Sequence, residues 1–471
     1  MTTYQAVIIG GGPAGHTAAV RIAQLGGKVA LVERDFIGSI CTNWGCTPSK
    51  SMIESAKVAK TIADGAYYGV DVATYAVNFG RVAERRDQVI QQTRASITDL
   101  LQHHCVDIFQ GEGRILSPNE VAVKGGKLDP DGETMKYDGE SRMLTTENII
   151  IATGSQPMIP GFIDSNDPGI VSSNRLISIK ELPETLTIIG GGVIGLEFAT
   201  IFSNLGTKVT IIEFLDRVLA QMDEEISSTI TDLMEENGVT VLTAYKCLAI
   251  ADGMVTAENM HTGETITIPS PMTLVAIGRK AVINQQMFDT AGLEYTPKGV
   301  GVDAHMRTNV KGIWAVGDAT GRSILAHVGI QQGVVAAENI MRKDGQNLRK
   351  MDYAIIPAVI YSIPEIVGVG TVPENLEGIQ FSRVPFSKNL RAGIENYPEG
   401  FLKVWIRENH VIAAQALGHH VYEIMQELAN MIAMETPIAA VSEIIHAHPT
   451  YAEIIRSALE SAQGKAVDFY L

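Results

Sequence analysis

Two cysteines separated by four residues, Cys41 and Cys46, are the side chains of this sequence best suited to redox chemistry. Five steps along an ideal helix rise about 7.5 Å and rotate about 500°, so an unbroken helix would not bring the thiols together. A disulfide needs Cα atoms roughly 4.4–6.8 Å apart, which requires a distorted chain, and Gly45 lowers the cost of that distortion. A bond in so small a loop would be reducible and suited to thiol exchange. The spacing alone also fits two unrelated buried thiols.

A glycine loop near the N-terminus predicts a dinucleotide site just before these cysteines. The elements expected around it are a strand over residues 4–9, a helix over 17–25 and a strand over 28–32. Gly10 allows the tight turn, Gly12 lets the backbone approach a pyrophosphate, and Gly15 lets the helix pack on the strand. The N-terminus of the helix would face the phosphates. Glu33 ends the second strand and can accept hydrogen bonds from a ribose.

The same pattern occurs a second time, so two dinucleotide ligands are expected. Its elements are a strand over 186–189, a helix over 196–205 and a strand over 207–212. Gly190, Gly192 and Gly195 form the loop. Glu213 follows the second strand, where a carboxylate favours a free 2′-hydroxyl and repels a 2′-phosphate. The prediction is therefore NAD rather than NADP, and Arg217 is the one nearby residue that argues otherwise.

Composition limits the class of protein. The chain has 471 residues, too many for one core, and suggests about three domains. Its net charge of −16 argues against nonspecific nucleic-acid binding. No apolar run is long enough for a membrane span, and the start lacks a signal sequence. Four cysteines in such a chain do not form a secreted framework, so we expect a reducing, cytoplasmic location and a catalytic disulfide. Cys105 and Cys247 have no partner in spacing.

Taken together, the motifs resemble a known family. They are Cys41-x4-Cys46-x-Pro48-Ser49-Lys50, Ala152-Thr153-Gly154-Ser155-x-Pro157, Thr308-Asn309 with Gly312 to Asp318, and His446-x-His448-Pro449-Thr450-x-x-Glu453. In this order they resemble the FAD-dependent pyridine nucleotide–disulfide oxidoreductases, and most closely the branch that oxidises dihydrolipoamide. The resemblance covers the whole chain.

The resemblance implies an α/β fold with two Rossmann-like dinucleotide-binding domains, for FAD and NAD, and an α+β C-terminal dimerisation domain. The implied boundaries are 1–147 for FAD, 148–272 for NAD, 273–345 for a central segment completing the FAD domain, and 346–471 for the interface. The sequence itself predicts a turn-rich arm or loop over 124–142, a polar boundary over 343–349, a hairpin over 400–418 and a helix over 422–434.

The resemblance also assigns roles to the redox residues. Cys41 would exchange with the substrate sulfur, and Cys46 would lie against the flavin. His448 would be the base, reaching across a homodimer from the other subunit. If the chain turns into a helix after the proline that follows, Glu453 can hydrogen-bond this imidazole and raise its basicity. His446 has no clear role and is expected to be structural.

Lys50 and Glu197 form a further candidate pair, which the resemblance brings together near the flavin and the nicotinamide. A cation there would stabilise negative charge on a reduced flavin. Glu197 is expected on the first turn of the helix after the second glycine loop. The remaining cofactor-binding residues implied are Gly113, Thr153, Gly154, Ser155, Gly278, Asp318 and Ala326; no metal is implied.

Departures from the family pattern concern the substrate more than the reaction. Between the cysteines stand Thr42, Asn43 and Trp44, and the indole could reshape the substrate channel or shift the redox potential. The leading hypothesis is oxidation of dihydrolipoamide carried on a lipoyl protein or lipoyl acyltransferase of a multienzyme complex, with reduction of NAD. The alternative is an NADH-dependent reductase of another small disulfide. A docking role in a multienzyme complex is compatible with the first.

Overall fold

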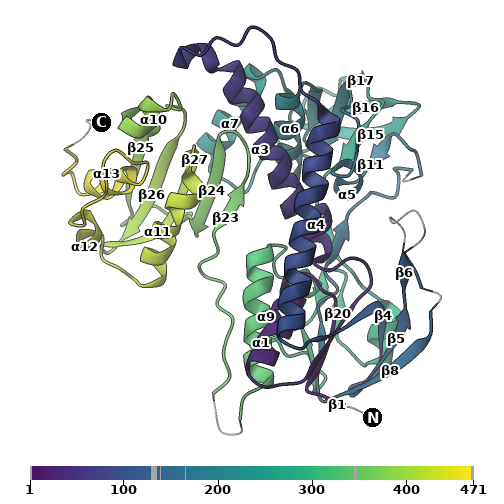
Figure 1. The fold of residues 1–471 in the computed structure, drawn as a ribbon. Coiled ribbons are helices and arrows are strands. Elements are labelled where there is room, and N and C mark those ends of the chain that lie inside the picture. Colours follow the sequence, from purple (N-terminus) through teal and green to yellow (C-terminus); the bar gives the residue numbers. More distant parts are fainter. Residues whose placement is uncertain (1–2, 129–134, 138, 165, 344–346, 468–471) are drawn as a thin grey trace.

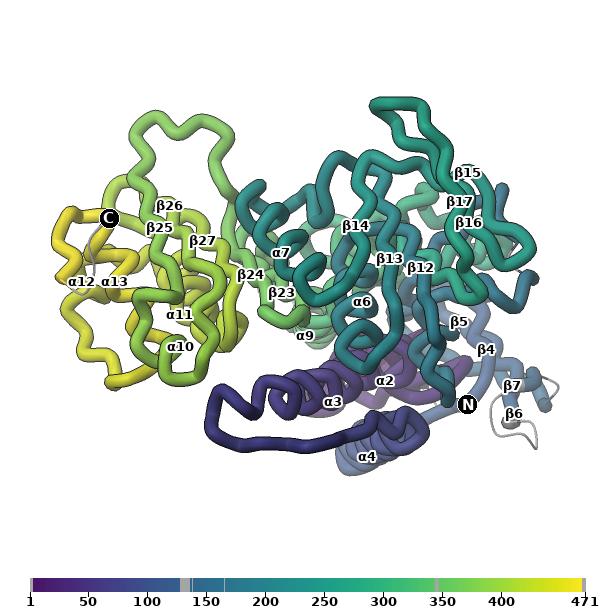
Figure 2. Tube along the Cα trace, turned by 90° about the horizontal axis from the view of Figure 1, so that it is seen from above, coloured from purple at the N-terminus to yellow at the C-terminus, as the bar shows by residue number. Residues whose placement is uncertain are grey.

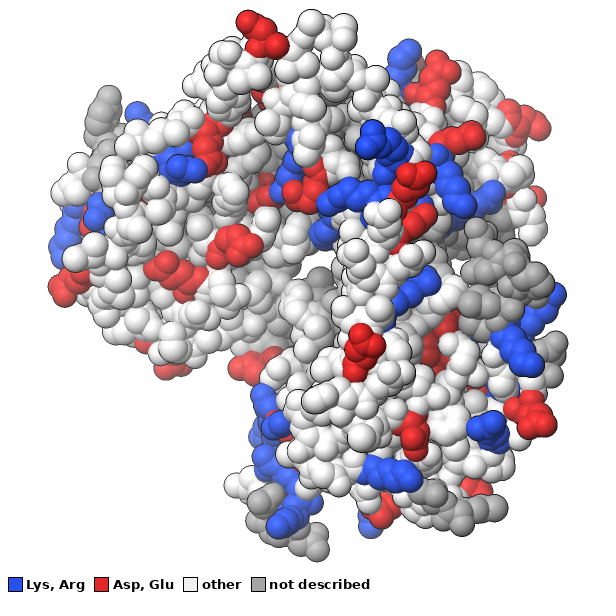
Figure 3. Space-filling model, in the orientation of Figure 1, with Lys and Arg blue, Asp and Glu red and all other residues white. Residues whose placement is uncertain are grey.

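Three sheet-based regions make up the computed structural model, which describes residues 3–128, 135–137, 139–164, 166–343 and 347–467. Figure 1 shows the C-terminal region on the left, connected to the other two by the long segment between α9 and β23. None of the helices in the described part of the chain combines the length and apolarity needed to cross a membrane. On the face drawn in Figure 3, acidic and basic side chains are interspersed.

The first region is built on an eight-stranded sheet in the order β1-β8-β5-β4-β3-β2-β9-β22. Its strands are β1 (Thr3–Tyr4), β2 (Ala6–Ile9), β3 (Val29–Glu33), β4 (Asp107–Ser117), β5 (Glu120–Gly125), β8 (Ser141–Thr146), β9 (Ile149–Ile151) and β22 (Ile313–Ala315). The strands from β3 to β22 are parallel and almost wholly buried, which explains their continuous Val and Ile runs. Helices α1 (Pro13–Gln24) and α9 (Ala326–Ile340) pack together against this sheet. Thus β22 and α9 bring residues after 312 back into the first region.

The second region has a parallel five-stranded sheet in the order β11-β18-β12-β13-β14. Its strands are β11 (Ile170–Val171), β12 (Thr185–Ile189), β13 (Lys208–Ile212), β14 (Thr240–Leu242) and β18 (Thr273–Val275), with helices α5 (Ser173–Leu176), α6 (Val193–Leu205) and α7 (Glu224–Glu236). A three-stranded sheet of β15 (Tyr245–Ala251), β16 (Met254–Asn259) and β17 (Thr265–Pro269) lies beside it. The chain enters through β10 (Ser155–Pro157) and leaves through β19 (Arg279–Ala281), and these two strands pair antiparallel.

The C-terminal region is an antiparallel sheet in the order β23-β24-β27-β26-β25. It contains β23 (Ala358–Ile360), β24 (Glu365–Gly370), β25 (Gln380–Pro385), β26 (Phe401–Arg407), β27 (His410–Gly418), α10 (Leu390–Ile394), α11 (Val421–Ala433), α12 (Ile438–Ser442) and α13 (Glu453–Ala462). The expected hairpin is confirmed as β26 and β27. Its two turn residues, Glu408 and Asn409, both have positive φ, as two-residue hairpin turns of type I′ require.

A long helical column connects the three regions. It consists of α2 (Ser39–Trp44), α3 (Cys46–Ala63) and α4 (Phe79–His103), and Figure 2 shows α3 and α4 side by side. Met52 and Ile53 of α3 share one buried cluster with Phe202 of α6 and with Phe401 and Leu417 of the C-terminal sheet. The helix that begins at Cys46 therefore packs against the second region and the C-terminal sheet, and α4 beside it contacts α1 of the first region.

The smaller elements complete the chain. They are η1 (Gly65–Tyr68), β6 (Lys127–Leu128), β7 (Met135–Lys136), α8 (Gln285–Thr290), β20 (Tyr295–Thr296), β21 (Gly299–Val300), η2 (Gly317–Thr320) and η3 (Phe386–Lys388). Strands β6 and β7 pair within the expected arm, whose residues 129–134 and 138 lie outside the described chain. The polar boundary expected over 343–349 also falls partly there, at 344–346.

The α/β class with two dinucleotide-type sheets is confirmed, but the helix starts are earlier than expected. Helix α1 begins at Pro13 and α6 at Val193, because Gly12 and Gly192 are already the N-cap residues. The second half of each glycine loop is thus the first helical turn. Glu197 consequently lies on the second turn of α6, so its placement on the first turn was wrong. The domain boundaries themselves stay a prediction.

Candidate active site

The two cysteines lie at a break between helices. Helix α2 ends at Trp44 and α3 begins at Cys46, with Gly45 between them at φ −137° and ψ −112°. A Cβ on Gly45 would come 3.0 Å from the carbonyl oxygen of Ile40, so the turn is tight. The break brings the thiols into contact without an unbroken helix.

The two thiols, both free in the structure, have opposite acid–base character. The hydrogen bond to the Cys46 sulfur and burial raise the pKa of Cys41. The same hydrogen bond, together with the charge of Lys50, lowers the pKa of Cys46 to about 7 despite burial. Cys46 is therefore the better thiolate and the better leaving group, and Cys41 needs a base.

The buried side chain of Asn43 stabilises α2 through hydrogen bonds. The side-chain amide of Asn43 donates to the carbonyl oxygens of Ser39 at 2.7 Å and Ile37 at 3.2 Å, and its oxygen accepts from Arg94 of α4. The Arg94 guanidinium also lies 3.7 Å from the centre of the Phe36 ring. These contacts fix the short helix that carries Cys41.

Lys50 and Glu197 meet as an ion pair. The Lys50 ammonium donates to both carboxylate oxygens, at 3.0 and 2.9 Å, and α3 packs against α6. The carboxylate is largely buried and also accepts from the backbone N–H of Tyr361 at 3.1 Å. The ammonium lies 4.2 Å from the centre of the Tyr361 ring. Residues from all three regions therefore meet one turn beyond Cys46.

The first glycine loop fits the pyrophosphate of a dinucleotide. A Cβ on Gly15 would lie 1.9 Å from the carbonyl oxygen of Gly10, which has φ of +113°, so the crossing of β2 and α1 requires both glycines. Glu33 is 4% exposed and accepts from the backbone N–H of Gly11 at 2.6 Å. The buried hydroxyl of Thr153 has no hydrogen-bond partner among the described residues. These are the features of a cradle for a polar ligand at the end of β2 and β9.

A second cluster lies where β10, β19 and η2 meet. Ser155 donates to the Asp318 carboxylate at 2.6 Å, and Arg279 donates to the Ser155 hydroxyl at 2.9 Å and to its carbonyl at 3.0 Å. Burial raises the pKa of Asp318 against the effects of Ser155 and Arg279, and the charge of Cys46 acts on Arg279 as well. The cluster therefore lies close to the thiols.

The other residues assigned to cofactor binding surround these two clusters. Gly154 and Gly278 have φ of +72° and +131° beside β10 and β19, and Ala326 is the first residue of α9. Gly113 lies within β4, where a Cβ would come 3.2 Å from the Val32 side chain. Gly113 faces the side chains of Val32 and Ile9, whereas α9 packs with α1 on the other face of the first sheet, and the roles of these residues stay predictions.

The second glycine loop repeats the geometry of the first. A Cβ on Gly195 would lie 2.0 Å from the Gly190 carbonyl oxygen. Glu213 accepts from the backbone N–H groups of Gly191 and Leu215. Arg217 is turned to the loop that follows, where its guanidinium donates to two backbone carbonyls at 2.9 Å. The one residue that argued for a 2′-phosphate is therefore occupied elsewhere.

His448 and Glu453 form a hydrogen-bonded pair in the C-terminal region. The Nδ1 atom of His448 lies 2.8 Å from Glu453, whose other oxygen accepts from the Thr450 backbone N–H at 2.7 Å. Although burial opposes it, these hydrogen bonds lower the pKa of Glu453, so the carboxylate stays charged and fixes the imidazole. The ring is 64% exposed. His446, in contrast, has a 7% exposed side chain that contacts Glu427 at 3.2 Å.

The histidine pair is remote from the cysteines of its own chain. In Figure 2 the helices α12 and α13, which flank the segment 443–452, lie at the left edge of the molecule, well away from α2 near its centre. A single copy of the chain therefore does not bring His448 to Cys41.

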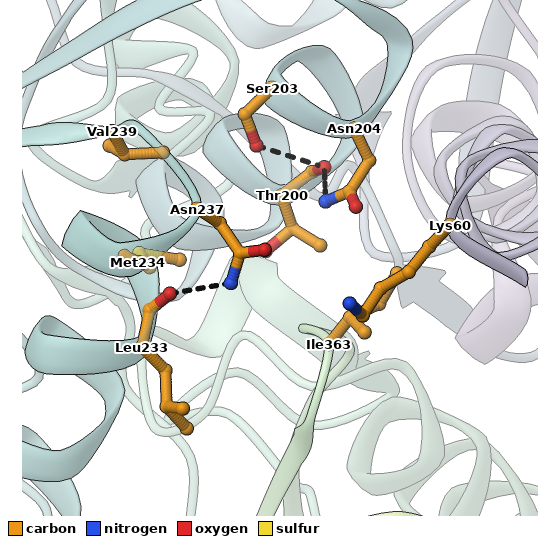
Figure 4. A pocket seen from close by; sticks show the side chains of 9 residues that line it. All are labelled: Lys60, Thr200, Ser203, Asn204, Leu233, Met234, Asn237, Val239 and Ile363. Carbon is orange, nitrogen blue, oxygen red and sulfur yellow. Dashed lines mark hydrogen bonds between the residues drawn. The ribbon is translucent and has the colours of Figure 1, made fainter. Parts of the chain in front are cut away.

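Two hollows lie away from the thiols. Figure 4 shows a cavity of about 10 Å³, room for one water molecule, where the hydroxyl of Thr200 is buried without a partner in the described chain. Lys60 of α3 and Asn237 after α7 also line it. A polar cleft of about 830 Å³ lies at the start of β22, beside Arg307 and Arg342. Neither contains a residue assigned to the redox site.

Sequence reasoning missed three contacts of the site. Arg279 directly follows Gly278, which was the only residue of this segment assigned to the site, and a basic residue after an apolar stretch is the signal that could have found it. For the Asn43–Arg94 pair, the one signal in the sequence is that an amide side chain, Asn43, stands between the two cysteines. Tyr361 follows a short apolar strand in a distant part of the sequence, and no spacing rule indicates its contact with Lys50.

The sequence and the fold agree with one protein family. Residues 4–333 match the pyridine nucleotide-disulphide oxidoreductase family, and residues 356–459 match its dimerisation domain. The chain belongs to this family and is an oxidoreductase.

Individual relatives narrow the comparison. The chain is 33% identical to a dihydrolipoyl dehydrogenase of Bacillus subtilis over 482 residues, covering 99% of this chain and 100% of that protein. It is 34% identical to a dihydrolipoyl dehydrogenase of Chlamydia pneumoniae over 464 residues, covering 96% and 95%. Among solved structures it resembles the HOCl-induced flavoprotein disulfide reductase RclA from Escherichia coli, solved as a Cu(II) complex, with a TM-score of 0.85, 25% identity and coverage of 98% and 100%.

Proposed function

We propose that the protein oxidises dihydrolipoamide carried on a partner protein and reduces NAD, through the Cys41–Cys46 pair and FAD. The observation that carries this proposal is the polarity of the two thiols: Cys41 donates its proton toward Cys46, whose pKa is lowered to about 7. The curated relatives named dihydrolipoyl dehydrogenase support the choice of substrate.

The chain's own residues support a thiol–disulfide exchange. With Cys41 and Cys46 as a disulfide, a substrate thiolate attacks the Cys41 sulfur and Cys46 leaves as a thiolate, which Lys50 stabilises. The second substrate thiol loses its proton to a base and attacks the substrate sulfur of the mixed disulfide. This step forms the substrate disulfide and expels Cys41 as a thiolate, which takes up that proton. The substrate has lost two electrons, and the enzyme now holds the dithiol.

Two dinucleotides complete the cycle. Bound FAD would supply the two-electron acceptor that links the dithiol to NAD. Gly10, Gly15, Glu33 and Thr153 fit FAD at the first sheet, and the Ser155–Asp318 pair lies beside it. At the second sheet, Glu213 and the turned-away Arg217 favour NAD over NADP.

The base is His448 of a second copy of the chain. In Figure 2, α2, which carries Cys41, lies well away from α12 and α13, whereas a base must come within about 3 Å of the proton that it removes, directly or through one water. The match to the family's dimerisation domain supports a homodimer with a shared site. We also propose a cytoplasmic location, since a reducing compartment suits a catalytic disulfide.

A second candidate is an NADH-dependent reductase of another small disulfide. It is favoured by the structural likeness to RclA, a flavoprotein disulfide reductase, and by Trp44, which contacts the Phe36 ring beside the thiols. An indole at this position narrows the choice of substrate.

The test measures NAD reduction by the FAD-loaded dimer with free dihydrolipoamide and with a purified lipoyl protein. We expect turnover with both and a lower KM for the protein-bound form. Oxidised glutathione and other small disulfides are assayed in parallel with NADH. Faster turnover of one of these disulfides, with negligible oxidation of dihydrolipoamide, would support the second candidate and reject the first.

A further inference from the structure

A tyrosine from the C-terminal region contacts both members of the Lys50–Glu197 pair. Its backbone N–H donates to Glu197 at 3.1 Å, and its ring lies 4.2 Å beneath the Lys50 ammonium. The first contact survives any substitution except proline, whereas the second belongs to the side chain. The two contributions of Tyr361 can therefore be separated by mutation.

The ring contact matters because lysine is a flexible side chain. Its ammonium is a compact charge on a four-carbon stem with three rotatable donors. Glu197 holds the ammonium from one direction through two oxygens, and the Tyr361 ring holds it from another. A cation over the face of an aromatic ring is attracted by the ring quadrupole, more strongly where water is excluded. The Lys50 side chain is 33% exposed, so the ring replaces part of its solvent shell.

Lys50 is the nearest cation to the reactive sulfur on the same helix. It follows Cys46 by four residues, which places both side chains on one face of α3. Its charge favours the thiolate of Cys46, while the charge of Glu197 opposes it. The balance at the sulfur therefore depends on where the ammonium is held relative to the carboxylate.

The ring is itself braced. Tyr361 packs against Tyr422 of α11 with ring centres 5.4 Å apart, and the Lys57 ammonium lies 6.0 Å from the centre of the Tyr422 ring. Lys57 also pairs with the buried Glu365 at 2.9 Å. Lys57 is seven residues after Lys50 on the same face of α3, so two lysines and two tyrosines form a ladder from the redox site to the C-terminal sheet.

We infer that Tyr361 is a positioning residue, which holds the Lys50 ammonium beside the Cys46 sulfur and so keeps this sulfur as a thiolate. The inference rests on the proposed redox function of the dithiol and adds a residue from the C-terminal region to it. The charged and titratable groups that act on Cys46 are Cys41 of α2, Lys50 of α3, Glu197 of α6, Arg279 of β19 and Tyr361 itself.

The experiment compares Tyr361→Leu with Tyr361→Phe in the FAD-loaded dimer. Each protein is reduced with one equivalent of dithionite, and the long-wavelength absorbance of the Cys46 thiolate beside the flavin is titrated against pH. We expect the midpoint of Tyr361→Leu to rise by about half a unit, a roughly threefold fall in the acid dissociation constant, which leaves about half of the parent's thiolate at pH 7. Tyr361→Phe should titrate like the parent protein, because the ring remains and only the hydroxyl is lost.

Tyr422→Leu is the matched control. It removes the ring from Lys57 and the brace from Tyr361 but leaves the Tyr361 ring itself under Lys50, so the midpoint should rise clearly less than in Tyr361→Leu. An equal shift in Tyr422→Leu would mean that general loosening, not the ring beneath Lys50, moves the midpoint, and would overturn the inference. An unshifted Tyr361→Leu with full FAD content would overturn it too.

Two further results keep the test decisive. If Tyr361→Leu does not retain FAD, Tyr361→Met replaces it, because methionine fills the space without an aromatic face. Dithionite reduction requires neither NAD nor dihydrolipoamide, so the titration is independent of the substrate. A parent enzyme that fails to oxidise dihydrolipoamide while the midpoint still rises in Tyr361→Leu would reject the proposed substrate and leave the role of Tyr361 intact.

Discussion

Two sulfur atoms with opposite acid–base tendencies face each other at the start of α3. Their difference comes mainly from the direction of one hydrogen bond, which raises the pKa of Cys41 and lowers that of Cys46. In the proposed exchange, Cys41 stays protonated until a base removes its proton, and Cys46 is the leaving group. The sequence predicted the pair, but the spacing of the cysteines does not reveal which of them is the acid.

The first prediction separates the two thiols. In the reduced, FAD-loaded enzyme a long-wavelength absorbance should grow as pH rises through about 7, because deprotonation of Cys46 supplies the charge that interacts with the flavin. Cys46→Ser should abolish this band and Cys41→Ser should retain a thiolate beside the flavin. The measurement is an absorbance titration. Loss of the band in Cys41→Ser alone would reverse the assignment.

The second prediction concerns Glu213. Replacing it with glutamine removes a charge that repels a 2′-phosphate, so the preference for NAD over NADP should narrow by at least about tenfold in kcat/KM. Arg217 stays bonded to backbone carbonyls in this variant and adds no new phosphate contact. Steady-state kinetics with both nucleotides test this, with FAD content as the control. A parent enzyme that uses NADP as well as NAD would contradict the argument.

At the scale of elements, each glycine loop combines a ligand cradle with a helix–strand crossing. This part could be predicted from the sequence, because a strand, a loop, a helix and an acid within 35 residues obey local rules. The helix starts could not, since the second half of each loop is already helical. Lys50 and Glu197 are 147 residues apart, so only the family resemblance brought them together. Arg279 and Tyr361 reach the site through tertiary packing, and contacts of this kind produce no pattern in the sequence that would predict them.

The third prediction separates two roles of the glycines in the second loop: the packing of α6 on β12 and the approach of the backbone to the dinucleotide. Gly195→Ala would place a Cβ 2.0 Å from the Gly190 carbonyl, which forces α6 away from β12 and should destabilise the fold by about 1–3 kcal/mol. Gly192→Ala meets no atom within 4 Å. It should keep the parent's melting temperature but raise the KM for NAD, because the methyl group lies where the backbone approaches the pyrophosphate. Equal melting temperatures of the two variants would contradict the proposed division.

At the scale of the whole molecule, one chain holds its thiols and its histidine apart. Helix α3, which begins at Cys46, packs against the second region and the C-terminal sheet, while the His448–Glu453 pair lies beside α13 in the C-terminal region. The exposed imidazole has a charged partner in Glu453 but no thiol of its own chain within reach. In the proposed homodimer, the second subunit would supply that thiol.

The fourth prediction tests this sharing. His448→Gln should lower dihydrolipoamide turnover by roughly 10²–10⁴-fold while FAD binding and dimerisation survive, and Glu453→Gln should cost less, because it orients the ring and transfers no proton. Chains carrying Cys41→Ser and chains carrying His448→Gln are inactive alone, but a mixed dimer contains one intact site. Activity should therefore return when the two are combined. No recovery from verified mixed dimers would show that the site is not shared.

The antiparallel pairing of β10 with β19 has a consequence for how such a protein can be rearranged. The chain enters the second region through β10 and leaves it through β19, and these strands are neighbours. Residues 158–278 are therefore joined covalently to the rest of the chain through two adjoining strands. A segment attached in this way can be exchanged as a cassette without rerouting the remaining chain. Ser155 and Arg279, however, lie on those very strands and hydrogen-bond toward Asp318. A graft that swaps nucleotide preference must therefore be spliced inside this pair of strands, or it will remove the hydrogen bonds of Ser155 and Arg279 that lead to Asp318.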